Sequence, residues 1–280
     1  MSIVTILKKI NILFDPLLEI RIIGRNRVLL KQLIIRNIEA RYKGSILGII
    51  WSFIQPLLML CVYTFVFSVV FTMRWGVEIE SRGAFAIIML CGMSIYNIFS
   101  ESVSICCGII PGNPNYVKKV IFPLEILPLA QVIASFILGM SWFILLFIGV
   151  CIVFGRVSLT MLFLPITLLP LLFLTYGLCM LVASLGVYVR DIQYLVGVVL
   201  QILFFITPIF YPITAVPEEY RGILQINPLT TIVEETRKIF LMEQLPDWNL
   251  LAISFIVSLM IMRLGIVWFI KTKKGFADVL

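Results

Sequence analysis

The chain has 280 residues, of which 61% are hydrophobic and 13% are charged, and its mean hydropathy is +1.10. A soluble domain cannot bury so much apolar surface, whereas a bilayer core about 30 Å thick is crossed by a helix of roughly 20 apolar residues. The net charge of +7 is spread unevenly about the apolar runs, which indicates membrane topology rather than nucleic-acid binding. We therefore expect an all-helical protein that crosses the membrane several times.

The amino-terminal segment 1–47 is rich in basic residues and is predicted to be a cytoplasmic interface segment. Its apolar residues recur at roughly helical spacing: Leu29, Leu30, Leu33, Ile34 and Ile38. This pattern predicts an amphipathic helix on the inner membrane surface, with a helix packed against the bundle as the alternative. No short cleavable apolar core is present, so we expect no signal peptide.

Six apolar runs are long enough to span a bilayer, and together they form a predicted transmembrane domain over 48–270. We place them near 48–73, 84–105, 125–154, 159–188, 193–212 and 249–270. Basic residues crowd the segments before the first span and after the second, fourth and sixth spans. Because positive charge is retained on the inner side, both termini, including the tail 271–280, are expected to be cytoplasmic.

The connection between the second and third spans has the composition of a short helix near 113–123. Asn113 and Pro114 can begin this helix, and Pro123 ends it after about two turns. A helix this short is not stable alone, so another element must pack on it. A docking helix and a simple connecting loop are the two interpretations of this segment.

A second candidate site on the inner side follows the fourth span. Arg190 and Asp191 stand together there. A lone pair of opposite charges on a surface usually contributes little, so a topology-setting role and a functional role both remain open.

The segment 213–247 lies on the predicted outer side and is too apolar for a solvated loop. Pro217 followed by two glutamates reads as one helix start, and Asn227-Pro228 reads as a second. We expect two short helices that re-enter the outer membrane face. An external hairpin packed on the bundle is the alternative.

Aromatic residues cluster in and beside the first and fifth spans. The set comprises Trp51, Phe53, Tyr63, Phe65, Phe67, Phe71, Trp75, Phe204, Phe205, Phe210 and Tyr211. Interface anchoring and helix packing explain any single member. For the set as a whole, a conduit lined by aromatic faces on which sugar rings can slide is an equal alternative.

The sequence contains little that could support catalysis. It has no histidine and no GxxxxGK[ST] phosphate-binding loop, so any pumping must draw its energy from a partner. Glu101 and Arg263 are the clearest ionisable residues near span ends, and both are expected to reach a membrane interface. The six cysteines lie in or beside apolar runs and are expected to be buried thiols without a metal.

An ordered set of motifs resembles the ATP-binding-cassette permeases that export polysaccharides. The first motif begins with Arg41-Tyr42-Lys43-Gly44-Ser45-Ile46-Leu47-Gly48 and continues with Trp51 and Gln55-Pro56. The later ones are Asn113, Lys118-Lys119, Phe122-Pro123, Glu125, Val189-Arg190-Asp191, Thr207-Pro208, Asn227-Pro228 and Gly275-Phe276-Ala277-Asp278. Each motif is weak alone, but the resemblance covers nearly the whole chain in the family's order.

The resemblance implies a homodimeric permease in a bacterial inner membrane, served by two copies of a separate ATPase that binds ATP and Mg²⁺. This chain itself would hold no cofactor. The ATPase-coupling residues implied in this way are Asn113, Tyr116, Lys118, Lys119, Phe122, Pro123, Glu125, Arg190 and Asp191. The first and fifth spans would line the path, and the helices within 213–247 would form the external gate. Family substrates are lipid-linked O-antigens, capsular polymers and teichoic acids.

The basic residues near the first span suggest a binding point for the lipid diphosphate of such a substrate. Arg36, Arg41 and Lys43 could attract it, although positive-inside topology alone also explains them. We therefore expect the membrane subunit of an ATP-driven exporter of a lipid-linked polysaccharide. The rivals are an exporter of a small drug or lipid with the same fold, a membrane enzyme of lipid-linked sugar metabolism and, more remotely, a structural anchor.

Overall fold

The structure is a computed structural model, and it describes residues 23–70, 82–118 and 122–280. All regular structure in these ranges is helical. The first half contains α3 (Arg27–Tyr42), α4 (Trp51–Thr64), α5 (Arg82–Cys106), α6 (Pro114–Val117) and α7 (Ile126–Phe154). The second half contains α8 (Leu164–Tyr188), α9 (Ile192–Ile206), α10 (Glu218–Ile226), α11 (Pro228–Leu241), α12 (Trp248–Thr272) and α13 (Phe276–Val279).

Within the described residues, four helical segments are long and apolar enough to cross a membrane. They are Gly83–Cys106, Ile126–Phe154, Leu159–Tyr188 and Trp248–Val279. They correspond to the predicted second, third, fourth and sixth spans. The protein is therefore an all-helical, multi-pass membrane protein.

The predicted first and fifth spans are represented by shorter apolar helices, Gly48–Thr64 and Ile192–Ile206. The first continues as a π-helix over Phe65–Val70, after which the predicted span runs into residues outside the described ranges. The fifth ends at Ile206, six residues before the predicted end at 212. Pro208 explains the early end, because proline lacks the N–H that a continuing helix needs and disfavours helical geometry in the residue before it.

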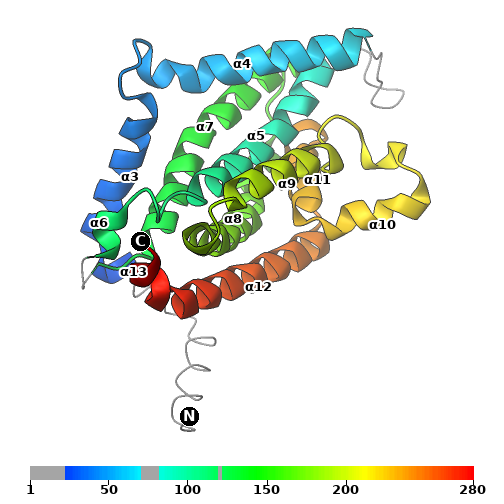
Figure 1. Ribbon diagram of the computed structural model, residues 1–280. Coiled ribbons are helices and arrows are strands. Elements are labelled where there is room, and N and C mark those ends of the chain that lie inside the picture. Colours follow the sequence, from blue (N-terminus) through cyan, green and yellow to red (C-terminus); the bar gives the residue numbers. More distant parts are fainter. Residues whose placement is uncertain (1–22, 71–81, 119–121) are drawn as a thin grey trace.

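The helices are arranged so that short elements gather at opposite ends of the bundle (Figure 1). At one end, α3 leads to the start of α4, and α6 and α13 lie close to the other end of α3 (Figure 1). At the other end, α10 projects from the bundle and α11 connects it to α12. We call these the α3 end and the α10 end.

Helix α3 packs against the bundle, mainly against α7. Leu30 and Leu33 are its buried residues, which is the outcome expected of the apolar positions in its sequence pattern. The alternative of a helix packed on the bundle therefore describes α3 well.

The closest helix–helix packing is between α8 and α12. Gly177 of α8 faces the backbone of α12 so closely that an added Cβ would overlap the Cα of Met262, and a Cβ on Gly265 would overlap the carbonyl oxygen of Gly177. Glycine is required at this crossing because two helix backbones touch there. The contact holds α8 and α12 together as one unit.

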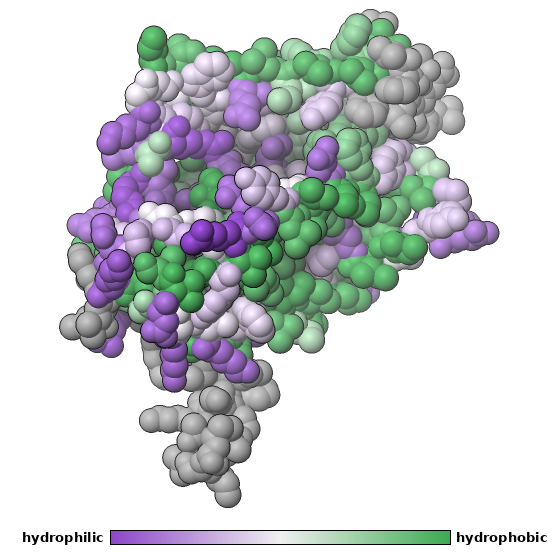
Figure 2. Space-filling model, in the orientation of Figure 1, coloured by the Kyte–Doolittle hydropathy of each residue, from purple (hydrophilic) through white to green (hydrophobic). Residues whose placement is uncertain are grey.

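Hydrophobic and hydrophilic residues occupy different parts of the surface. Figure 2 shows hydrophobic residues over the middle of the molecule, across α9 and α12, and hydrophilic residues gathered at the α3 end and at the tip of α10. Many large apolar side chains of α9 are exposed, including Tyr194, Leu195 and Ile202. Such an apolar middle with polar ends fits a body embedded in lipid.

Candidate functional site

The segment 113–125 lies at the α3 end and is shorter in helix than predicted. Its helix α6 covers only Pro114–Val117, a single turn, rather than about two turns ending at Pro123. Asn113 does not cap α6; its Nδ2 donates to the carbonyl oxygen of Ile109 at 2.8 Å, back toward α5. Tyr116, Phe122 and Glu125 make side-chain contacts, and Lys119 lies, with residues 120 and 121, outside the described residues.

Two aromatic rings of this segment stack on each other, and an arginine of α3 binds one of them. The rings of Tyr116 and Phe122 are stacked, with centroids 4.3 Å apart and an interplanar angle of 19°. Arg36 of α3 donates from Nη1 to the hydroxyl oxygen of Tyr116 at 3.0 Å, and its guanidinium carbon lies 5.7 Å from the ring centroid. The segment is therefore tied to α3, a link that the sequence pattern did not predict.

The end of the segment is held by an ion pair. Lys273 Nζ lies 2.7 Å from Glu125 Oε1, and the Glu125 side chain is only 12% exposed. Glu125 is thus a structural partner within this chain, whereas Lys118 is exposed to the surroundings.

Arg190 and Asp191 are exposed and lie at the same end of the bundle as the 113–125 segment. Tyr188, just before them, donates from its hydroxyl to the carbonyl oxygen of Thr272 at 2.7 Å. Thr272 is followed by Lys273, which pairs with Glu125. The structure thereby brings together at one surface the two sites that the sequence separated by about 70 residues.

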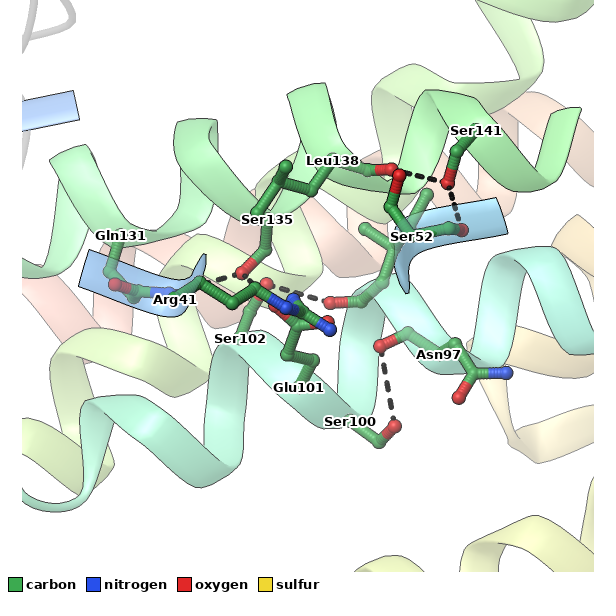
Figure 3. A network of polar contacts seen from close by, with 11 residues as sticks. Arg41, Ser52, Asn97, Ser100, Glu101, Ser102, Gln131, Ser135, Leu138 and Ser141 are labelled. Carbon is green, nitrogen blue, oxygen red and sulfur yellow. Dashed lines mark hydrogen bonds and ion pairs between the residues drawn. The ribbon is translucent and has the colours of Figure 1, made fainter. Parts of the chain in front are cut away.

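Beside this surface is a cavity of about 550 Å³ between α3, α5 and α7, which we call the arginine cavity; most of its lining surface is apolar. Its polar lining residues are Arg36, Asn37, Arg41, Glu101, Asn113 and Gln131. Arg41 forms an ion pair with Glu101, and the side chains are 31% and 24% exposed (Figure 3). Two of the basic residues predicted to bind a lipid diphosphate, Arg36 and Arg41, thus line the same cavity. The third, Lys43, is exposed just beyond α3.

Glu101 is paired within the protein, where its carboxylate forms the ion pair with Arg41. Ser135 Oγ donates to Glu101 Oε1 at 3.4 Å, and Gln131 Nε2 donates to Ser135 Oγ at 3.2 Å. Figure 3 shows these side chains converging from α5 and α7 on the arginine. With two arginines against one carboxylate, the cavity lining carries a net positive charge, which suits an anion.

Five rings form an aromatic cluster between α4, α5 and α9: Tyr63, Tyr96, Phe204, Phe205 and Phe210. Ring centroids are 5.4 Å apart for Tyr63 and Phe210, and 5.0 Å apart for Phe204 and Phe210. A pocket of about 290 Å³ opens beside it, lined partly by Tyr63, Tyr96 and Phe204 and partly by the amides Gln55, Asn97 and Gln201.

Other members of the predicted aromatic set lie apart from this cluster. Trp51 is at the opposite end of α4 and is 42% exposed. Tyr211 donates from its hydroxyl to the carbonyl oxygen of Phe205 at 2.9 Å, which closes the turn after α9. The side chain of Phe67, together with Phe71 and Trp75, lies outside what the structure describes.

At the α10 end, two helices begin where the sequence predicted. Glu218 and Glu219 stand in the first turn of α10, and Asn227 Oδ1 caps α11 by accepting from the backbone N–H of Leu229 at 3.1 Å. Helix α11 is buried, with Leu229, Ile232, Ile239 and Phe240 inside the bundle. The apolar residues Ile223 and Ile226 of α10 are 62% and 80% exposed on the surface of the chain.

Sequence reasoning missed the buried charges of α11. Arg237 is 1% exposed; it donates to Glu234 Oε1 and to the carbonyl oxygen of Ile209, both at 2.8 Å. Glu235 is also 1% exposed; it pairs with Lys238 at 2.7 Å and accepts from the backbone N–H of Asp247 at 2.7 Å. The clue in the sequence was the run of two acidic and two basic residues within one helix. A buried charge requires a partner of opposite charge, and these residues can supply it to each other.

The described residues offer no centre for metal chemistry. No group of three or more Cys, Asp or Glu residues is positioned there to hold a metal ion. All six cysteines are free thiols, four of them buried. The functional features of the described part of the chain are therefore surfaces, cavities and ion pairs.

Comparison with known proteins gives a consistent result over most of the chain. Residues 28–241 match the family described as ABC-2 type transporter. The chain is 30% identical over 265 residues to the O-antigen export system permease protein RfbA of Myxococcus xanthus, covering 92% of this chain and 98% of that protein.

Two further relatives extend the comparison. The O-antigen export system permease protein RfbA of Klebsiella pneumoniae is 28% identical over 249 residues, covering 88% of this chain and 92% of its own length. The polysialic acid transport protein KpsM of Escherichia coli is 25% identical over 216 residues, covering 76% and 81%. This chain belongs to the ABC-2 type transporter family.

Proposed function

We propose that this chain is the membrane subunit of an ATP-driven exporter that moves a lipid-linked polysaccharide, such as an O-antigen, out across a bacterial inner membrane. The single observation that carries the proposal is the near-complete coverage of relatives named as O-antigen export permeases. The cavities described above are compatible with it, because one suits an anion and the other combines rings with amides. A separate ATPase supplies the energy and holds ATP and Mg²⁺, and this chain holds no cofactor.

The proposed topology has six spans, with α4 and α9 completing the four long spanning segments. Both termini face the cytoplasm, so the α3 end is the inner end. Retained positive charge supports this orientation, because the α3 end carries the basic residues of α3, Lys118, Arg190 and the lysines after α12. Helices α10 and α11 then re-enter the outer face as the external gate.

The ATPase docks on the inner surface formed by the 113–125 segment and the Arg190-Asp191 turn. Exposed residues there, including Lys118 and Arg190, are available to contact it. Two copies of this chain would form the path between them, with α4 and α9 facing it. The exposed apolar side chains on both helices support this arrangement, since a second copy would cover them.

The arginine cavity is the proposed binding place of the substrate's lipid diphosphate. Arg36 and Arg41 line it, and Lys43 stands nearby. Arginine suits this role because its planar donors match phosphate oxygens in pairs. The aromatic cluster is the proposed sliding surface for sugar rings, whose C–H faces stack weakly on aromatic faces.

The decisive experiment is to co-purify the chain with the ATPase encoded beside it and to reconstitute the complex in lipid vesicles. Addition of a polyprenyl diphosphate-linked glycan should stimulate ATP hydrolysis, and the same lipid without its diphosphate should not. Stimulation only by small amphiphilic drugs would replace the proposal with a drug or lipid exporter. Conversion of the glycan by the chain alone would replace it with an enzyme.

A further inference from the structure

The residues after α12 pack against the bundle at the α3 end. A short 3-10 turn, Lys273–Gly275, leads into α13. Phe276 of α13 is fully buried, with its ring centroid 5.4 Å from that of Phe269 and 5.8 Å from that of Tyr188. We call residues 273–280 the tail.

Polar contacts hold the end of α12, from which the tail begins. The hydroxyls of Ser184 and Thr272 lie 2.6 Å apart, and the Tyr188 hydroxyl donates to the Thr272 carbonyl oxygen at 2.7 Å. A Cβ on Gly275 would lie 2.7 Å from the Tyr188 hydroxyl oxygen, so the tail passes close to this side chain. The tail therefore belongs to the same unit as α8 and α12.

From this position Lys273 reaches across to Glu125, at the junction of the 113–125 segment and α7. The 2.7 Å pair joins residues 148 positions apart, and the flanking Leu124 and Ile126 are 4% and 0% exposed. Glu125 stands at the N-cap position of α7 but makes no side-chain cap bond. Its carboxylate is used instead to bind Lys273.

The 113–125 segment is thus held from two sides. Arg36 of α3 holds it at Tyr116, and Lys273 of the tail holds it at Glu125. The second link leads directly into α12, which touches α8 backbone to backbone at Gly177 and Gly265. A displacement of the segment can therefore be transmitted through these contacts to α12 and α8.

We infer that the tail is part of the coupling machinery, and that Lys273 and Glu125 are positioning residues that make the α8–α12 unit follow the 113–125 segment when the ATPase moves it. The inference rests on the proposed function and adds a role for the carboxyl-terminal tail. Helix α12 extends to the α10 end, where it packs against α11, so the same unit joins the inner surface to the outer helices.

The test is a charge swap in the reconstituted complex of the full chain and its ATPase. Lys273→Glu and Glu125→Lys are made singly and together, with Lys274→Glu as the matched control, because Lys274 is the adjacent, exposed lysine. ATP hydrolysis and transport of a polyprenyl diphosphate-linked oligosaccharide are measured in the same vesicles. Thermal stability and the amount of bound ATPase are recorded for each variant, and Lys273→Gln serves as the milder change.

Each single reversal should lower the oligosaccharide transported per ATP hydrolysed by about fivefold or more, the size expected for a coupling of about 1 kcal/mol between contacting groups. The double swap should restore the ratio to within about twofold, and Lys274→Glu should leave it unchanged. Lys273→Gln should lower the ratio without loss of bound ATPase.

Single reversals that match Lys274→Glu, or a double swap that remains as poor as the single variants, would overturn the inference. A wild-type complex that binds no ATPase, or that is not stimulated by the glycan, would instead refute the proposed function. The two failures are therefore distinguishable.

Discussion

Arg237 of α11 donates from Nη2 to the backbone carbonyl oxygen of Ile209 at 2.8 Å, so a buried charge holds the turn that follows α9. The same guanidinium binds Glu234 through Nη1. A backbone carbonyl oxygen is costly to leave unpaired inside the protein. Arg237 therefore stabilises the turn that follows α9 and connects the proposed gate to the proposed path.

Replacing Arg237 with alanine should destabilise the protein by about 2–4 kcal/mol, because it leaves the Ile209 carbonyl oxygen and the Glu234 carboxylate without this partner. Thermal unfolding of the purified protein in detergent measures the loss. The matched control is Arg27→Ala, an exposed arginine of α3, which should change the unfolding temperature little. Equal stability of Arg237→Ala and wild type would contradict the role assigned to this residue.

Replacing Gly265 with alanine should separate α8 from α12, because the new Cβ would overlap the carbonyl oxygen of Gly177. We expect a loss of about 1–3 kcal/mol despite the better helix propensity of alanine. Gly197→Ala in α9 is the control, since no atom lies within 4 Å of its added Cβ. That variant should be neutral or slightly stabilised, and the same ranking should hold in thermal unfolding and in protease resistance.

Replacing Glu101 with glutamine should strengthen binding of a diphosphate lipid, because the carboxylate pairs with Arg41 and adds negative charge to the cavity. The glycan concentration for half-maximal ATPase stimulation should fall about fivefold, the change produced by roughly 1 kcal/mol. Arg41→Gln should raise it by a similar factor. If both variants weaken binding, the ion pair organises the cavity and does not compete with the substrate.

Replacing Phe204 with alanine should slow transport of the glycan while ATPase binding is kept. Its ring centroid lies between 4.9 and 6.0 Å from those of four other rings, which belong to Tyr63, Tyr96, Phe205 and Phe210. Phe204→Tyr should retain most activity, because the aromatic face is kept. Ile202→Ala, an exposed apolar change on the same helix, controls for general loss of surface. Transport that follows side-chain size rather than aromaticity would argue against stacking.

The sequence was sufficient for features that depend on local physics. Continuous apolar runs predicted α5, α7, α8 and α12 almost to their ends. Proline and asparagine placed the starts of α10 and α11, because both act on the backbone of the first turn. For the helix expected over 113–123, the structure describes one turn, Pro114–Val117, and residues 119–121 lie outside the described ranges.

The candidate site was also only partly predictable from the sequence. Residue types indicated that the 113–125 segment and the start of the first span are functional. No local pattern shows that Arg41 meets Glu101 or that Arg36 reaches Tyr116. These contacts depend on how α3 lies across the bundle. They decide whether a charged residue faces a partner protein, a substrate or its own chain.

The sequence by itself determined that this is a helical membrane protein, which segments are apolar enough to enter lipid and where most helices begin, because hydropathy and backbone geometry act within a few residues. Only the tertiary structure decided that Lys273 binds Glu125, that Arg237 is buried against Ile209 and that α8 and α12 meet at glycines. Ion pairs and close backbone contacts join residues far apart in the chain, and their energies depend on distances that only folding sets.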